Sequence, residues 1–308
     1  MTIYMREQFH PDAMKRLHEL ATVVNTLDDP EAIDGVMIRA GGVSRELIEQ
    51  LPNLKVIGRH GAGYDTVDLQ AAKERGITVV NVPSGNSDSV AELIVGLALN
   101  LERRITEANM VCRAEGYPTI APASCCGTEL KEKTFGSIGM GNIASRAARI
   151  LVNGFEMKAL GYDRHSSPEQ AAKKGFEKVA TVEELLERSD VVNISVPLNA
   201  GTKDMISGAM FDHFKPGAVL INCARGGVVN EDDLYDALIS GKLKAAACDA
   251  FVQEPVSSTN RLLTLPNFSA TPHIGGNTED AIRRTGLQLV ENVVRVIKGE
   301  PAVGVVKL

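Results

Sequence analysis

Short apolar runs alternate along the chain with segments whose apolar residues recur at every third or fourth position. The runs are rich in Val, Ile and Leu and are bounded by Gly, Pro, Asn and Asp, which is typical of β-strands. The expected strands form two series, the first being Ile3-Tyr4, Thr22–Asn25, Gly35–Arg39, Leu54–Gly58 and Ile77–Asn81, and the second Thr134–Gly139, Met157–Asp163, Val191–Val196, Ala218–Cys223, Ala245–Asp249 and Phe268–Thr271. Because helix-like segments separate successive strands, the pattern predicts an α/β fold with two parallel sheets covered by helices.

The helix-like segments include two long amphipathic stretches. One begins near Asp88, where Ser89 and Glu92 have capping-box spacing, and its apolar stripe continues to Ile105. The other extends from about Glu279 to Lys298, with a glycine as its stop. Shorter helices are expected at 10–20, 44–51 and 67–75, and two more with capping boxes at Ser167 and Thr181.

Composition places the chain among globular proteins with cores of aliphatic side chains. Its 308 residues suggest about two domains, and 44% of them are hydrophobic while only 4% are aromatic. The formal charge of −6 argues against nucleic acid or an anionic membrane as a partner. The first ten residues lack the apolar stretch of a signal peptide, and the five cysteines have no zinc-site spacing. We therefore expect a reduced, cytoplasmic protein without a bound metal.

A glycine pattern typical of dinucleotide binding opens the second series of strands. The segment Gly139-Met140-Gly141-Asn142-Ile143-Ala144 matches Gly-x-Gly-x-x-Gly/Ala at a predicted strand-to-helix turn. The first glycine permits the tight turn, the second lets a pyrophosphate approach the backbone, and Ala144 packs helix on strand. Free N–H groups at the start of the helix would bind the pyrophosphate. Alone, the pattern equally fits an ordinary tight turn.

The acidic residue at the end of the next expected strand supports a dinucleotide. Asp163 lies about twenty residues beyond the glycine turn, where an acid accepts hydrogen bonds from the adenosine ribose hydroxyls. This carboxylate favours NAD over NADP. The basic neighbours Arg164 and His165 leave the alternative open, because a basic side chain can bind a 2′-phosphate.

Three later residues form a plausible catalytic set. Arg225, Glu254 and His273 each follow a short apolar run, so we expect them at or just beyond the carboxyl ends of strands, where open α/β sheets bind ligands. An arginine binds a carboxylate at two points, a histidine moves a proton near neutral pH, and a glutamate orients the histidine. Each residue alone has an ordinary structural interpretation, but the combination downstream of a dinucleotide fingerprint predicts an active site.

Several blocks along the chain have the order of motifs in one known family. They are Gly58–Asp68, Asn81–Leu93, the glycine fingerprint, Tyr162-Asp163, Asn222–Gly227 and Thr271–Gly276. In these blocks the chain resembles the D-2-hydroxyacid dehydrogenases, and most closely the branch that contains D-3-phosphoglycerate dehydrogenase. The resemblance covers nearly the whole chain.

This resemblance implies two Rossmann- or flavodoxin-like lobes, with the cofactor lobe inserted into the substrate lobe and the active site in the cleft. The implied boundaries are 1–99 with 286–308 for the substrate lobe and 100–285 for the cofactor lobe. Family members are usually dimers through the cofactor lobe, so a homodimer is expected. The catalytic trio carries over onto Arg225, Glu254 and His273. Implied NAD contacts are Val82, Gly139, Gly141, Asn142, Ile143, Asp163, Val196, Cys223, Ala224, Asp249, Gly275 and Gly276, with Asp249 expected to bind the nicotinamide amide.

The expected substrate is a small 2-hydroxy or 2-keto acid. Backbone N–H groups of Gly61, Ala62 and Gly63 are expected to hold its carboxylate together with Arg225. Candidates for binding a second anionic group, such as the phosphate of D-3-phosphoglycerate, are Arg39, Arg59, Arg103 and Arg104, for which solvated surface charge is the alternative.

The resemblance leaves two rival functions open and has two departures. The rivals are an NADPH-dependent glyoxylate or hydroxypyruvate reductase and a non-catalytic NAD(H)-sensing protein like the related corepressors. Formate dehydrogenase is disfavoured because it lacks the glutamate that Glu254 matches. The tract Gly116–Gly127 lacks the Trp usual in relatives and is slightly longer. The chain stops at Leu308, so feedback through the family's carboxyl-terminal regulatory extension is not expected.

Overall fold

The computed structural model describes residues 1–117 and 119–308. They form two compact units: Met1–Ser89 with Gly276–Leu308, hereafter unit 1, and Val90–Gly275, hereafter unit 2. The boundaries expected from the resemblance are 1–99 with 286–308 and 100–285. They lie later along the chain than the observed boundaries at both points where the chain passes from one unit to the other. One unit is thus contiguous in sequence, and the other is built from both ends of the described chain.

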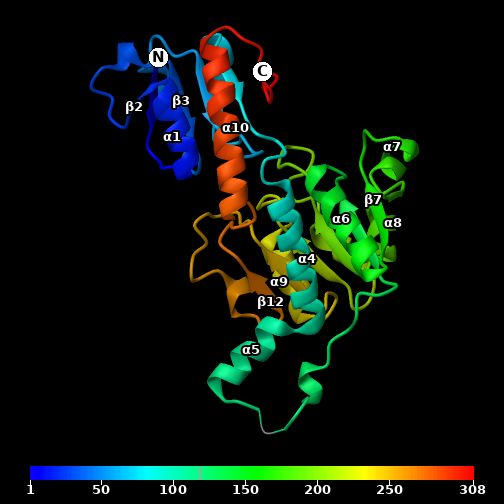
Figure 1. The fold of residues 1–308 in the computed structure, drawn as a ribbon. Coiled ribbons are helices and arrows are strands. Elements are labelled where there is room, and N and C mark those ends of the chain that lie inside the picture. The colour runs from blue at the N-terminus through cyan, green and yellow to red at the C-terminus, as the bar shows by residue number, and fades with distance from the viewer. Residues whose placement is uncertain (118) are drawn as a thin grey trace. The chain divides into compact units, whose positions relative to one another are not determined.

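Unit 1 contains a five-stranded parallel sheet with the flavodoxin-like order β2-β1-β3-β4-β5. Its strands are β1 (Thr2–Met5), β2 (Thr22–Val24), β3 (Gly35–Ile38), β4 (Val56–Arg59) and β5 (Thr78–Val80). Its helices are α1 (Pro11–Leu20), α2 (Arg45–Glu49), α3 (Leu69–Glu74) and α10 (Glu279–Ile297). Helix α10 lies alongside α1 (Figure 1) and packs on β4, so the later chain segment covers one face of this sheet.

Unit 2 contains a seven-stranded parallel sheet with the order β12-β11-β10-β9-β6-β7-β8. Its strands are β6 (Thr134–Ile138), β7 (Lys158–Tyr162), β8 (Glu177–Lys178), β9 (Val191–Ile194), β10 (Val219–Asn222), β11 (Ala245–Cys248) and β12 (Phe268–Ala270). Its helices are α4 (Ser87–Arg103, which starts in unit 1), α5 (Ile105–Ala114), α6 (Asn142–Phe155), α7 (Pro168–Lys173), α8 (Val182–Arg188) and α9 (Glu231–Ile239). The strand order reverses between β6 and β9, as in a Rossmann fold.

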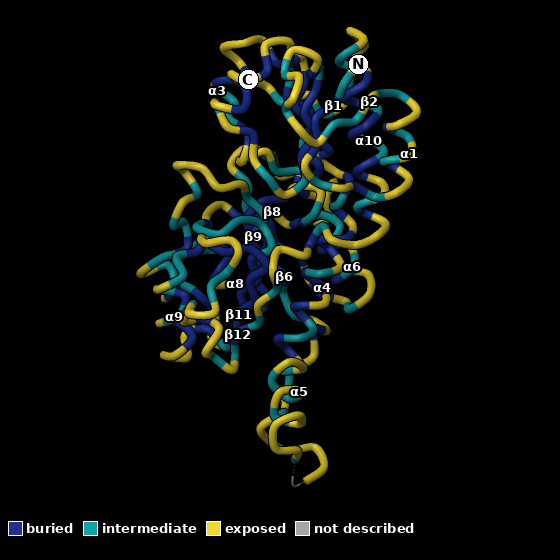
Figure 2. Tube along the Cα trace, turned by 90° about the vertical axis from the view of Figure 1, so that its left-hand side faces the viewer, coloured by how far each residue is buried: buried dark blue, intermediate teal, exposed yellow. Residues whose placement is uncertain are grey.

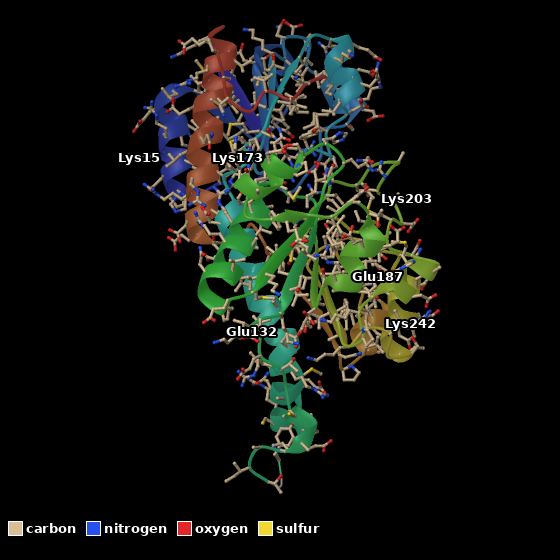
Figure 3. All side chains as sticks on the ribbon, turned by 90° about the vertical axis from the view of Figure 1, so that its right-hand side faces the viewer. Lys15, Glu132, Lys173, Glu187, Lys203 and Lys242 are labelled. Carbon is tan, nitrogen blue, oxygen red and sulfur yellow. The ribbon has the colours of Figure 1, made fainter. Side chains whose placement is uncertain are left out.

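Both faces of the unit 2 sheet are buried in apolar side chains. Along β10, Val219 and Ile221 belong to one apolar cluster and Leu220 to the other, so successive side chains pack on opposite faces. Charged side chains such as Glu187 and Lys242 project from the outer surface of the unit (Figure 3). The predicted α/β class with two parallel sheets is confirmed.

The first long helix differs from its prediction at both ends. Helix α4 begins at Ser87, so Ser89 lies in its first turn and is not the N-cap. It ends at Arg103, because Arg104 adopts a left-handed conformation with φ 54°, and Ile105 then starts α5 with 54% of its surface exposed. The predicted continuous stripe through Ile105 is therefore wrong.

The predicted helix starts at Ser167 and Thr181 are confirmed, with different capping. Ser167 forms a capping box with Gln170 at the start of α7. Thr181 Oγ1 accepts from the N–H of Glu184, 3.1 Å away, but the Glu184 carboxylate accepts from Ala180 instead of from Thr181. The second start thus has a single cap rather than a full box.

Helix α5 and the residues after it extend away from the sheet of unit 2 (Figure 1). We call this segment the arm (residues 105–117 and 119–127). Figure 2 shows mostly exposed and half-buried residues along it. Its base is closed by backbone, because the N–H of Thr128 donates to the carbonyl of Glu102 over 2.9 Å. The fully buried Glu102 carboxylate accepts from Lys244 Nζ at 2.6 Å and from the Thr128 hydroxyl. An ion pair whose carboxylate is fully buried therefore fixes the point where the arm leaves the unit.

The described residues provide neither a membrane-spanning helix nor a cluster of metal-ligating side chains. Within residues 1–117 and 119–308, no helix is long and apolar enough to cross a membrane. The same residues contain no group of three or more His, Cys, Asp or Glu side chains that could hold a metal ion.

Candidate active site

The glycine-rich turn lies at the strand-order reversal of unit 2. Gly139 follows β6 with φ 95°, and a Cβ there would approach the carbonyl carbon of Ser195, which follows β9, to 2.8 Å. Only glycine fits this left-handed position beside a neighbouring backbone. Val196 lies at the same place, 3.0 Å from that Cβ position. The fingerprint thus occupies the switch point at which open α/β sheets bind ligands.

The start of α6 can accept a pyrophosphate. Gly141 is the N-cap of this helix, and glycine has no side chain with which to cap the N–H groups of the first turn. Apart from its chain neighbours, a Cβ built on Gly141 meets no atom of the described chain within 4 Å, so the backbone is open to a ligand there. Asn142 is exposed, Ile143 is half-buried, and Ala144 is fully buried against the sheet, as the fingerprint requires.

Asp163 follows β7, directly beyond Tyr162. Burial raises the pKa of its carboxyl, but hydrogen bonds from the N–H groups of His165 and Ser166 and the charge of Lys174 outweigh this and lower the pKa below its usual value. The side chain is therefore ionised at neutral pH. Its Oδ1 accepts the N–H of His165 at 2.8 Å, so one of the two basic neighbours is held by backbone to the same carboxylate.

Glu254 and His273 are brought together in unit 2 although they are 19 residues apart. His273 Nδ1 lies 2.9 Å from Glu254 Oε2 and 3.0 Å from Oε1. Glu254 Oε1 also accepts the N–H of Phe251 at 3.1 Å, which fixes the carboxylate. An acceptor at Nδ1 assigns a proton to that nitrogen and leaves Nε2 to exchange a proton with a substrate.

The backbone of His273 is held in an uncommon conformation. Its φ is 54°, in the left-handed region that costs a non-glycine residue about 1 kcal/mol or more. Hydrogen bonds from its N–H to the carbonyls of Asp249 (2.9 Å) and Thr271 (3.0 Å) maintain it. Such strain is common at functional positions, where surrounding contacts hold a side chain in one direction.

Asp249 is the buried anchor of the segment that carries His273. Its Oδ1 accepts the Thr271 hydroxyl at 2.6 Å and the N–H of Ile274 at 2.8 Å, and its Oδ2 accepts the N–H of Gly275 at 2.8 Å. A carboxylate has about four acceptor positions, and these described residues use three of them, which leaves one for a ligand N–H. Asp249 can therefore still accept a hydrogen bond from the nicotinamide amide, as expected from the resemblance. It also fixes the segment that carries His273, a role that the sequence did not suggest.

Arg225 lies in the turn after β10, beside the segment that leads to Glu254. Asn222 shapes this turn, because its amide donates to the carbonyl of Arg225 at 2.9 Å and its Oδ1 accepts the N–H of Ala224 at 3.1 Å. A Cβ on Gly226 would overlap the backbone of Phe251 and Val252. The glycine therefore lets the Arg225 turn pack directly on the turn that precedes Glu254.

The expected substrate loop lies in unit 1, after β4. Gly61 has φ 107°, which favours glycine. Its carbonyl accepts the N–H of Val82 at 2.9 Å, and the carbonyl of Ala62 accepts the Asn81 amide at 2.7 Å. The carbonyls of this loop are thus bound to the segment after β5, and Gly63, like Ala62, is half-buried. Val82, an expected cofactor contact, has no exposed surface in unit 1.

Arg39 and Arg59 lie together in unit 1, where their strands β3 and β4 end. Arg59 Nη1 donates to the carbonyl of Arg39 and, at 2.6 Å, to that of His60, so Arg59 has a structural role that the sequence did not indicate. Arg39 Nη2 donates to Asn277 Oδ1 at 2.5 Å.

The other two candidates for a second anion site are corrected by the structure. Arg104 pairs with Glu107 at 2.5 Å and lines a cavity of about 210 Å³ together with residues that precede β11 and β12, among them Lys244 and Asn267. This is the amino-terminal edge of the unit 2 sheet, whereas His273 lies beyond the carboxyl end of β12. Arg103 is exposed at the end of α4 on the same edge. Both arginines therefore belong to the base of the arm.

Three of the remaining expected cofactor residues lie in unit 2. Two of them are beside Asp249, and the third is in the Arg225 turn. Burial and the neighbouring Asp249 and Cys248 raise the pKa of the Cys223 thiol well above its usual value, so it is a neutral group. Ala224 forms part of the Arg225 turn, and Gly275 is buried against Asp249. Gly276 belongs to unit 1, where a Cβ on it would approach the Asn86 amide to 2.8 Å.

Known proteins are similar to this chain in both sequence and structure. Residues 95–275 match the family model of the D-isomer specific 2-hydroxyacid dehydrogenase, NAD binding domain. A D-3-phosphoglycerate dehydrogenase of Methanocaldococcus jannaschii is 38% identical over 99% of this chain, which spans 59% of that protein. A hydroxypyruvate reductase of Thermotoga maritima is 38% identical over 85% of this chain and 84% of that protein.

A solved structure is similar to this chain over its full length. The protein TT0316 of Thermus thermophilus has a TM-score of 0.89 and 29% identity, and each chain is covered completely. The chain spans only about half the length of several phosphoglycerate dehydrogenases that it matches, among them that of Archaeoglobus fulgidus at 50%. The matched family model, the full-length relative and the fold together show that the chain belongs to the D-isomer specific 2-hydroxyacid dehydrogenases, with its NAD-binding domain in unit 2.

Proposed function

We propose that the protein is an NAD-dependent oxidoreductase that interconverts a D-2-hydroxy acid and its 2-keto acid. The observation that carries the proposal is the His273–Glu254 pair, 2.9 Å apart, in the same unit as a glycine turn at the sheet's switch point. An acid–base histidine with its orienting carboxylate is the machinery that a carbinol–carbonyl conversion needs. The relatives named above support the same reaction class.

The reaction's proton is accepted and donated by Nε2 of His273. In the oxidising direction, the neutral imidazole accepts the hydroxyl proton of the substrate, and in the reducing direction the protonated imidazole returns a proton to the carbonyl oxygen. Glu254 keeps the proton on Nδ1 and stabilises the imidazolium that forms when Nε2 is protonated. NAD, when bound, would supply the hydride-transfer chemistry at the substrate's C2.

The substrate carboxylate is bound by a cation and by backbone. Arg225 presents a planar guanidinium that can bind a carboxylate at two points and polarise the adjacent C2 oxygen. We assign the second contact to N–H groups of the loop Gly61–Gly63, whose carbonyls at Gly61 and Ala62 are already bonded elsewhere in unit 1. These contacts orient C2 for the transfer.

The residues of unit 2 suit NAD as the cofactor. N–H groups of the α6 first turn, after Gly141, would bind the pyrophosphate, and the ionised Asp163 would accept hydrogen bonds from the ribose hydroxyls. Val196, Cys223 and Ala224 would contact the nicotinamide half, and Asp249 would accept a hydrogen bond from the carboxamide at its remaining acceptor position.

D-3-phosphoglycerate is the first candidate substrate, with Arg39 as the residue that binds its phosphate. Arg39 adds a positive charge to a region whose carboxylate ligand is already provided for, and a second anion would balance that charge. The relative that supports this choice is the phosphoglycerate dehydrogenase of M. jannaschii.

Replacing Arg39 with Ala is expected to raise KM for D-3-phosphoglycerate by about tenfold or more, since a charge-assisted hydrogen bond is lost. KM for glyoxylate, which has no second anion, should change less than about twofold. Initial rates with NADH or NAD over a panel of 2-keto and 2-hydroxy acids measure both. A wild type that prefers glyoxylate, or an Arg39→Ala variant that loses all substrates equally, would show that no second anion site exists.

A hydroxypyruvate or glyoxylate reductase is the second candidate function. One observation favours it: the T. maritima hydroxypyruvate reductase is matched over 84% of its length, more than the phosphoglycerate dehydrogenases. Hydroxypyruvate lacks the phosphate, so the same panel separates the two substrates. An NAD(H)-sensing binding protein remains the candidate of another class, and absence of turnover with every acid of the panel would favour it.

We propose that the protein acts in the cytoplasm as a homodimer that forms through unit 2. All five cysteines are free thiols, which suits a reducing compartment. The arm exposes three large apolar side chains that a second copy would cover: Ile105 (54% exposed), Met110 (60%) and Ile120 (99%). The tract Gly116–Gly127, which departs from the family pattern, belongs to this arm, except that Pro118 lies outside the described residues.

Met110→Glu is expected to convert the dimer into a monomer, because a charge would be buried without a partner in the interface. Sedimentation equilibrium at several protein concentrations measures the mass. Ile239→Glu is the matched control, since Ile239 is 59% exposed on α9 of the same unit, outside the arm. A monomeric wild type, or a Met110→Glu variant that stays dimeric, contradicts an interface on the arm.

A further inference from the structure

The loop that carries Arg39 is held by a carboxylate from another strand. Glu7 follows β1, and the loop Arg39–Gly42 follows β3. The two strands are adjacent and parallel, with Met5 opposite Met37, so both segments emerge at the same edge of the unit 1 sheet. The strand order of unit 1 reverses between β1 and β3, which is where a flavodoxin-like sheet binds ligands.

Three successive backbone N–H groups of this loop converge on Glu7. Its Oε1 accepts from Gly41 at 2.5 Å, and its Oε2 accepts from Ala40 at 2.8 Å and from Arg39. Successive N–H groups that point inward form a concave anion site, and here the anion is part of the protein. A Cβ on Gly41 would lie 2.9 Å from Glu7 Oε1, so the close approach depends on this glycine.

Side chains also hold the carbonyl groups of the loop. Arg59 Nη1 donates to the carbonyl of Arg39, and the Thr66 hydroxyl donates to the carbonyl of Gly41 at 3.1 Å. Thr66 is itself bound, since its carbonyl accepts the N–H of Val43 at 2.9 Å. The conformation of Arg39–Gly41 therefore depends on side-chain hydrogen bonds instead of a strand ladder or helix.

The charge of Glu7 is maintained at neutral pH. Burial raises the pKa of this carboxyl, but the hydrogen bonds from Ala40, Arg39 and Gly41 and the positive charge of Arg59 together lower the pKa below its usual value. A carboxylate that accepts several backbone N–H groups is stabilised in its ionised form. The three N–H groups are thereby unavailable to an external anion, which must bind to guanidinium groups instead.

The guanidinium group of Arg39 extends from this loop and can bind an anion. Its Nη2 donates to the neutral amide of Asn277, and within residues 1–117 and 119–308 no carboxylate lies at ion-pair distance from it. We propose that Glu7 is a positioning residue for the substrate: it fixes the Arg39–Gly42 loop and so directs the Arg39 guanidinium toward the second anionic group. This inference rests on the proposed function, because it assigns the way in which that site selects phosphorylated over simple 2-hydroxy acids.

The first test is independent of catalysis. Glu7→Gln keeps the shape of the side chain but removes its charge and puts an NH₂ group against N–H donors. Hydrogen exchange of the Ala40 and Gly41 amides, followed by NMR or by mass spectrometry of peptides that span them, should become about tenfold faster or more, since the bonds lost are charge-assisted. Glu31→Gln, at an exposed position of the same unit, is the matched control and should leave these amides unchanged. Unchanged exchange in Glu7→Gln overturns the proposal.

The second test separates positioning from general stability. In Glu7→Gln, KM for D-3-phosphoglycerate should rise about tenfold, while kcat and the KM for glyoxylate stay within about threefold of the wild type. In an Arg39→Ala background, Glu7→Gln should add no further change, because a residue that acts through Arg39 has nothing left to position. An equal rise in KM for both substrates, or full additivity with Arg39→Ala, overturns the proposal.

Failure of the proposed function can be recognised separately. If the wild type turns over neither acid, calorimetric titration with D-3-phosphoglycerate in place of kinetics gives the same comparison among wild type, Glu7→Gln and Arg39→Ala. Binding that weakens about tenfold in both single variants and no further in the double variant supports the role of Glu7 without any turnover. Binding that is equal in wild type and Glu7→Gln overturns that role.

Discussion

Replacement of His273 with Ala is expected to lower kcat by about 10²–10⁴, the range typical of a lost general acid–base group. The variant removes Nε2, the atom to which we assign proton transfer, and also the partner of Glu254. NADH binding, measured by fluorescence titration, should stay within about threefold of the wild type, because the expected pyrophosphate and ribose contacts lie at α6 and Asp163. The effect should therefore appear in turnover and not in cofactor affinity.

Two further variants sharpen this experiment. Glu254→Gln keeps a side chain of the same size beside Nδ1 but removes its charge, so kcat should fall less than in His273→Ala while the cofactor still binds. His18→Ala, at an exposed histidine of α1, should leave kcat unchanged. Near-normal turnover of His273→Ala at neutral pH would remove the histidine from the mechanism.

Asp163 is expected to give NADH an advantage over NADPH of about tenfold to a hundredfold in kcat/KM, as one charge-assisted hydrogen bond gained and one phosphate repelled imply. Asp163→Asn should remove most of this preference. The asparagine can still accept the N–H of His165, so the local turn is retained while the negative charge is lost. Initial rates with both reduced cofactors at several concentrations measure the change.

The control for the cofactor experiment is Asp212→Asn, an exposed aspartate of unit 2 that pairs with Lys242. It removes the same charge from the same unit away from β7 and should leave the cofactor preference unchanged. A wild type that clearly prefers NADPH would show that Arg164 and His165 outweigh Asp163, and the NADPH-dependent reductase would then become the better proposal.

Much of the fold could be predicted because strands and the glycine turn follow from local rules. A buried parallel strand needs a short continuous apolar run, and each run that the pattern marked from Gly35 onward forms a strand within a residue or two of its predicted ends. The glycine at position 139 is required by its own φ and by the nearby Ser195 backbone, which is why a short motif could predict the tight turn at the switch point. The Glu254–His273 pair was predicted from roles and order, and the structure places the two at hydrogen-bond distance.

What the sequence could not indicate depends on contacts between distant segments. The apolar stripe of α4 continues in sequence to Ile105, but the chain turns at Arg104 and the isoleucine is exposed on the arm. Nothing local to Glu7 distinguishes it from a surface glutamate, since its three partners lie more than thirty residues away. For the same reason Arg59 was predicted to be an anion ligand or a solvated surface charge, because its bonds to the carbonyls of Arg39 and His60 require the folded sheet.

The split of unit 1 between two chain segments has a consequence for synthesis on the ribosome. Unit 2 is contiguous, so all of it can emerge from the ribosome and fold before residues 276–308 have emerged. Until α10 emerges, β4 lacks the helix that packs on it, and β5 lacks its bridge from Val80 to Val305. During that interval the nascent unit 1 carries an apolar sheet face that α1 covers only in part. We therefore expect chaperones that bind exposed apolar strands to engage ribosome-bound chains of this protein through the earlier unit, and to release them after α10 has docked.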